Sequence, residues 1–110
     1  MAGWFEISRS ANGQHQFVLK AGNNEVILRS EQYKSRSSAK NGIASVQKNS
    51  GMDNRYDRKT AADGRMYFNL KAGNNQVIGT SQMYASPAGR DGGVESVKTN
   101  GSSTEVREIS

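Results

Sequence analysis

Two lysines at matching positions, 51 residues apart, each precede a short run of glycine and asparagine. Each run falls between two apolar segments, where such residues form a hairpin turn. The two turns would offer matched cations and carboxamides to a partner, although the same residues are also ordinary turn formers. The candidate binding residues are therefore Lys20, Asn23 and Asn24 in the first copy and Lys71, Asn74 and Asn75 in the second.

The other residues that could take part in catalysis or metal binding do not form a catalytic or metal site. His15 is the only histidine and the chain has no cysteine, which excludes a Cys-His pair and zinc sites of the cysteine type. We expect His15 to lie at the edge of the core. Glu6 and Asp57 occupy equivalent positions and could share acid/base work only if their strands were adjacent. We expect no catalytic residue, no metal, no cofactor and no enzymatic activity.

The charge of the chain points toward an anionic partner. Fifteen Lys and Arg residues against ten Asp and Glu residues give a net charge of +5. Residues 1–50 carry seven basic and three acidic side chains, and residues 51–110 carry eight and seven. An anion-binding face would therefore lie in the first half, which contributes Arg29, Lys34, Arg36 and Lys40. If the anion were a nucleic acid, exposed Trp4, Tyr56 and Tyr67 could stack on its bases.

A tandem repeat organises the chain. A shift of 51 residues aligns residues 17–49 with residues 68–100 without a gap, and 16 of the 33 aligned pairs are identical. The sequence LKAGNN occurs in both copies and is followed each time by a Val-Ile pair. This regularity predicts two copies of one structural unit.

Each copy shows the pattern of three strands followed by a helix. Asn12-Gly13 and Asp63-Gly64 predict turns after opening strands at residues 4–8 and 55–59. A second strand has alternating apolar residues, and a third contains the Val-Ile pair. The alternation of residue types does not show which face of this third strand is buried. Helices then begin at the capping residues Ser35 and Ser86. Their interior glycines, Gly42 and Gly93, predict a close approach of each helix to the sheet, and residues 104–109 suggest a final edge strand.

These motifs, with the Tyr-x-Ser helix entry, are similar to the YegP-like family of small bacterial proteins, whose function is uncharacterised. The resemblance implies an α+β fold in which two β-β-β-α(-β) units form one continuous antiparallel-type sheet. Two helices would cover one face with pseudo-two-fold symmetry, and the C-terminal strands would be exchanged. The strand near Tyr56 would both end the first unit and start the second. The second copy departs from the first at Arg90, Gly92 and Glu95.

We expect one domain over residues 1–110, with repeats at about 1–51 and about 52–110, because fifty residues bury too little surface to fold alone. No apolar run suggests a signal peptide or a membrane span. A cytoplasmic monomer with an internal pseudo-dimer is the expected state. For function, the missing catalytic groups favour an interaction module that binds another protein; the alternative is a basic protein that binds nucleic acid.

Overall fold

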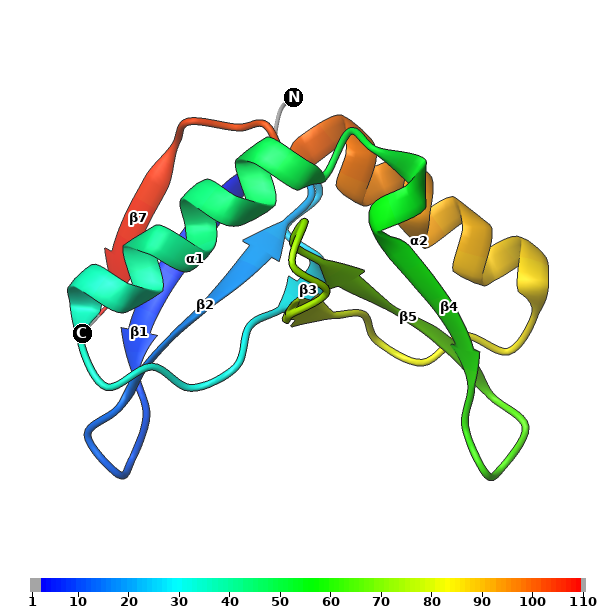
Figure 1. The fold of residues 1–110 in the computed structure, drawn as a ribbon, viewed down its shortest axis with the longest axis horizontal. Helices are drawn as coiled ribbons and strands as arrows, with labels where there is room; N and C mark the ends of the chain where they lie inside the picture. The colour runs from blue at the N-terminus through cyan, green and yellow to red at the C-terminus, as the bar shows by residue number, and fades with distance from the viewer. Residues whose placement is uncertain (1–2, 110) are drawn as a thin grey trace.

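The computed structural model describes residues 3–109, which form a seven-stranded sheet and two long helices on the same side of it (Figure 1). The order of the strands across the sheet is β4-β5-β6-β3-β2-β1-β7. This is the expected α+β arrangement. The elements are β1 (Trp4–Arg9), β2 (His15–Lys20), β3 (Val26–Arg29), α1 (Arg36–Asn49), the 3-10 turn η1 (Asp53–Arg55), β4 (Tyr56–Thr60), β5 (Met66–Lys71), β6 (Val77–Thr80), α2 (Pro87–Asn100) and β7 (Val106–Ile109).

The two repeats meet at the centre of the sheet, where β3 and β6 run antiparallel. Their paired residues are Arg29 and Thr80, which the 51-residue shift makes equivalent. The pseudo-two-fold axis therefore passes between them. Each helix contacts strands of both repeats, and the buried side chains of both repeats form one hydrophobic cluster.

Turn and cap residues act as their types predict. Gly13 and Gly64 have φ angles of 82° and 87°, in the left-handed region that glycine enters at little cost. The Oγ atoms of Ser35 and Ser86 accept hydrogen bonds from the backbone N–H groups three residues later, which caps α1 and α2. The local sequence therefore fixes where the hairpins turn and where the helices begin.

The third strand of each repeat buries two successive residues. The pairing of β2 with β3 shifts its register between Leu19 and Lys20, as at a β-bulge. An extra residue at a bulge turns a side chain away from strict alternation. Ile27 and Leu28 are consequently both buried, at 5% and 0% exposure, which explains why alternation alone could not assign this strand's buried face.

The interior glycines of the helices meet a tyrosine, as the prediction of a close approach requires. A Cβ atom added at Gly42 would lie 2.4 Å from the hydroxyl of Tyr33, and one added at Gly93 would lie 2.2 Å from the hydroxyl of Tyr84. Tyr33 stacks on Phe17 of β2 at 6.1 Å between ring centroids. The tyrosine therefore fills the space that a helix side chain would otherwise take.

The C-terminal strand crosses to the first repeat, as strand exchange predicts. β7 pairs with β1 in parallel, and the backbone N–H of Phe5 donates to the carbonyl of Glu105 at 3.0 Å. The sheet is therefore mixed, because β7 runs parallel to β1 whereas the other neighbouring strands are antiparallel. The repeat equivalent of β1 is β4, which pairs with β5 alone in residues 3–109.

Candidate binding site

The two candidate lysines pair with carboxylates on the neighbouring strand. Lys20 Nζ lies 3.2 Å from Glu6 Oε1, and Lys71 Nζ lies 3.2 Å from Asp57 Oδ2. Both pairs lie on the open face of the sheet, opposite the helices. The lysines are therefore partly neutralised, and β3 and β6 separate their strands.

The candidate asparagines shape the turns in which they lie. Asn24 and Asn75 adopt left-handed backbone conformations, with φ angles of 72° and 70°. The side-chain oxygens of Asn23 and Asn74 accept hydrogen bonds from the backbone N–H two residues later, at 3.1 Å in both turns. Asn23 also lines a cleft of about 240 Å³ against the glycine-bearing side of α2. Local turn geometry thus uses the side-chain oxygens of Asn23 and Asn74, while Asn24 Oδ1 accepts a hydrogen bond from Lys20 Nζ at 3.2 Å.

Glu6 and Asp57 do not form a carboxylate pair. Four strands lie between β1 and β4. The Trp4 indole N–H donates to Glu6 Oε2 at 2.8 Å, and this hydrogen bond, with the ion pair to Lys20, lowers the pKa of Glu6 below its ordinary value. Hydrogen bonds from Lys71 and Lys59 lower the pKa of Asp57 in the same way. Both groups are stabilised as anions, whereas a general acid needs a raised pKa.

Two of the aromatic residues considered as base-stacking groups are buried. Trp4 is 5% exposed because the Arg107 guanidinium covers its ring at 4.0 Å from the centroid. Tyr56 is 7% exposed, packs against Phe68 and donates its hydroxyl to the carbonyl of Ser50 at 2.6 Å. Burial raises the pKa of Tyr56. The expectation that Trp4 and Tyr56 are exposed is therefore wrong.

His15 is half-buried at the edge of the core, where we expected it. It lines a shallow cleft between β1, β7 and the start of α1, together with Arg9 and Arg36. Within residues 3–109, no three His, Asp or Glu side chains gather closely enough to hold a metal ion. In the same residues, no helix is long and apolar enough to cross a membrane.

The outer edge of β4 offers the backbone groups of Arg58 to a partner, whereas the Tyr56 N–H already donates to the carbonyl of Asp53. Phe68 on β5 uses both its backbone groups toward β6, because its N–H donates to Ser81 Oγ at 3.0 Å and its carbonyl accepts from Ser81 N at 2.9 Å. Arg58 lies directly across from Phe68 in the antiparallel pair. Its own N–H and carbonyl therefore point away from β5, toward the side where no described strand lies.

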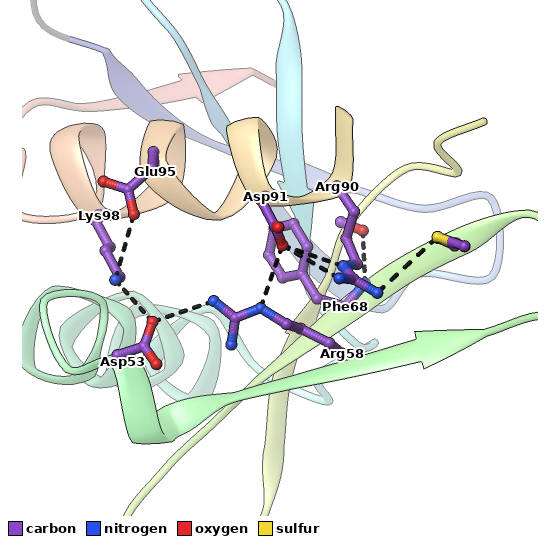
Figure 2. A network of polar contacts seen from close by, with 9 residues as sticks. Asp53, Arg58, Phe68, Arg90, Asp91, Glu95 and Lys98 are labelled. Carbon is purple, nitrogen blue, oxygen red and sulfur yellow. Dashed lines mark hydrogen bonds and ion pairs between the residues drawn. The ribbon is translucent and has the colours of Figure 1, made fainter. Parts of the chain in front are cut away.

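A network of ion pairs flanks this edge on the side of the helices (Figure 2). The Arg58 side chain lies 3.1 Å from Asp53 and 3.4 Å from Asp91, and Lys98 lies 2.8 Å from Asp53. Hydrogen bonds from Lys98 and Arg58 lower the pKa of Asp53. These ion pairs therefore hold the Arg58 side chain and the η1 turn in place beside the edge.

Sequence reasoning did not single out the β4 edge, although one signal was present. The strand near Tyr56 was expected to serve both repeats. Two symmetric units of four strands each would contain eight strands. If one strand both ends the first unit and starts the second, the sheet has seven. The missing strand belongs beside β4, at the position equivalent to that of β7 beside β1.

Comparison with known proteins places this architecture in one family. The sequence profile described as "Domain of unknown function (DUF1508)" matches residues 10–57 and again residues 61–108. A UPF0339 protein of Acinetobacter baylyi is 61% identical over 99% of this chain and 98% of its own length. The UPF0339 protein YegP of Escherichia coli is 57% identical over 98% of each chain.

Two solved structures share the fold. The solution structure of YegP from E. coli, a protein of unknown function, has a TM-score of 0.93 and covers 98% of this chain and 93% of its own. That of a UPF0339 protein from Shewanella oneidensis is 56% identical, with a TM-score of 0.92 and coverage of 98% and 92%. The repeat, the fold and the full-length similarity agree: the chain belongs to the DUF1508 family, which includes the YegP-like UPF0339 proteins and has no characterised function.

Proposed function

We propose that this protein is a non-enzymatic module that binds another protein by adding an extended segment of that protein to the outer edge of β4. One observation carries the proposal. The equivalent strands β1 and β4 are covered unequally within residues 3–109, because β1 lies between β2 and β7 whereas β4 has β5 as its one described neighbour. An extended segment beside β4 would complete the pseudo-symmetric sheet.

Strand addition draws its affinity from main-chain hydrogen bonds and its specificity from the side chains that alternate along the added strand. Each main-chain hydrogen bond contributes a net of about 0.5–1.5 kcal/mol. The edge is already ordered, because Tyr56 is fixed in the core and Arg58 is held by two carboxylates. An incoming segment would therefore pay little to order the surface that receives it.

Charged side chains on an edge strand can instead prevent pairing with other chains, and β4 carries Asp57, Arg58 and Lys59 in succession. A matched pair of variants separates the two roles. Arg58→Pro removes the outward N–H, which an edge strand tolerates, whereas Arg58→Ala removes the same side chain and keeps the N–H.

The test is capture of partners from a lysate by the tagged full-length chain. We expect a stoichiometric partner with the wild type and with Arg58→Ala, and its loss with Arg58→Pro. Thermal melts of both variants show whether the fold is kept. Recovery of the same partner by both variants, or of no stoichiometric partner by the wild type, would contradict strand addition at β4.

The second candidate function is binding of nucleic acid, and the surface of α1 favours it. Residues 32–52 contain four basic residues and no acidic residue. Lys40 and Lys48 on α1 are exposed. Affinity for duplex DNA would then fall with salt, with a log-log slope of roughly 0.9 per neutralised phosphate. The burial of Trp4 and Tyr56 leaves half-buried Tyr67 as the remaining one of the three stacking candidates, so duplex is the better substrate for this surface.

A gel-shift series tests this alternative. The double variant Lys40→Gln with Lys48→Gln should weaken binding, while Lys59→Gln with Arg65→Gln removes the same charge from the second repeat and should have less effect. Equal loss in both double variants would indicate non-specific attraction to a basic protein. No shift with duplex at low salt would eliminate the alternative.

A further inference from the structure

The pairing of β7 with β1 supplies a template for a strand beside β4. In that pairing Phe5 lies opposite Val106, Glu6 opposite Arg107 and Ile7 opposite Glu108, and the strands are parallel. The 51-residue shift carries Phe5, Glu6 and Ile7 onto Tyr56, Asp57 and Arg58. A strand that fills the equivalent position therefore runs parallel to β4 and places one side chain beside Asp57 on the open face. The bond from the Phe5 N–H to Glu105 has no counterpart at Tyr56, whose N–H donates to the Asp53 carbonyl, so such a strand bonds to the backbone of Arg58.

In the first repeat, β7 supplies a cation to that face. Glu6 pairs with Lys20, and the positive charge of Arg107 lowers the pKa of Glu6 further. The Arg107 guanidinium also lies against the Trp4 ring. Arg107 thus fits the aromatic surface of Trp4 and lies opposite Glu6, while its ion pair is with Glu105 of its own segment.

In the second repeat, the chain already supplies both cations. Lys59 Nζ lies 3.3 Å from Asp57 Oδ2 and Lys71 Nζ lies 3.2 Å from it, so two ammonium groups share one carboxylate. Lys59 stands where the first repeat has Ser8, and Arg55 stands where it has Trp4. The open face beside β4 therefore carries excess positive charge, and Arg55 replaces the indole that receives Arg107 in the first repeat.

We infer that the segment bound at β4 is acidic, runs parallel to the strand, and places an Asp or Glu beside Asp57 and Lys59 where β7 has Arg107. The inference rests on the proposed function, since it specifies the partner of that edge. It also makes the β7 strand of a second copy a less favourable occupant, because Arg107, although paired with Glu105 of its own segment, would lie beside Lys59 and Lys71.

Two synthetic peptides that differ at one position test the inference with the full-length protein. One has the sequence of residues 103–109, Ser-Thr-Glu-Val-Arg-Glu-Ile, and the other has Glu in place of Arg. Titration is followed by NMR at the backbone amide of Arg58, with the amide of Ile7 as the covered control. We expect the Glu peptide to bind roughly three- to ten-fold more tightly at low salt, as exposed charge pairs allow, and the difference to shrink as salt screens it.

Two further measurements sharpen the result. The variant Lys59→Ser restores the residue of the first repeat and should reduce the preference for Glu. A nitroxide at the peptide's amino end should broaden the Tyr56 amide more than the Thr60 amide, as a parallel strand requires. Equal or tighter binding of the Arg peptide, broadening of Thr60 instead, or no shift at Arg58 with millimolar peptide overturns the inference. The proposed function is decided separately, by capture with Arg58→Pro and Arg58→Ala.

Discussion

Neighbouring glycines in α2 should respond to alanine in opposite ways. A Cβ atom added at Gly92 meets no atom within 4 Å, whereas one at Gly93 would lie 2.2 Å from the Tyr84 hydroxyl and 2.6 Å from its Cζ. Both positions are in the interior of the helix, so both gain the same helix propensity, about 0.8–1.0 kcal/mol. Only Gly93→Ala also forces an overpacked contact.

The cost at Gly93 is large because Tyr84 has little freedom to move. Its ring stacks on Phe68, with 6.5 Å between the centroids, and its backbone pairs with Met66. Overpacking of this kind costs about 1–3 kcal/mol. Gly93→Ala should therefore be destabilised by up to about 2 kcal/mol, while Gly92→Ala gains about 1 kcal/mol and several degrees in melting temperature.

Thermal and urea unfolding followed by circular dichroism measures both changes. Equal urea m-values for the wild type and the two alanine variants would show that all three expose the same surface area on unfolding. If the two alanine variants shift in the same direction by similar amounts, then Tyr84 does not hold α2 against the sheet. The assignment of Gly42 to the same role in the first repeat would fail with it.

Three further predictions concern stability. Asn100→Ala should cost about 1–3 kcal/mol in urea unfolding, because Asn100 Oδ1 accepts from the buried Gly3 N–H at 2.8 Å; a change below 0.5 kcal/mol would show that this contact is dispensable. The lowered pKa of Glu6 means that its contribution is present above the ordinary value of 4.5 and is lost as the pH falls through the folded pKa. Glu6→Gln should therefore narrow the stability difference between pH 7 and pH 3 by about 1 kcal/mol or less, and an unchanged difference would refute this. Residues 1–51 alone should be unfolded or dimeric by sedimentation, whereas a cooperatively melting monomer would contradict a shared core.

The sequence was sufficient for the features that depend on local chemistry. Positive φ at Gly13 and the cap at Ser35 follow from residue type and position. The close approach at Gly42 follows from a glycine in a helix interior at the same place in both repeats. The resemblance to a known family supplied the exchange of the C-terminal strand.

The sequence was insufficient for features that depend on which strands are neighbours. The turn at Asn12-Gly13 predicts that β1 and β2 are neighbours, but the pairing of Lys20 with Glu6 also requires the exact register of the two strands, which that dipeptide alone does not give. Trp4 is buried by Arg107, which is 103 residues away in the chain. The same limit hid the β4 edge, because an absent neighbour becomes visible only once the strand order is known.

Amide hydrogen exchange at the equivalent residues Ile7 and Arg58 tests the open edge most directly. β7 covers β1 at Ile7, whereas the Arg58 N–H points away from β5. In the isolated protein we predict slow exchange at Ile7 and fast exchange at Arg58, and slow exchange at both once the captured partner is bound. Protection of Arg58 in the isolated monomer, or fast exchange at Arg58 in the saturated complex, would contradict binding at the β4 edge.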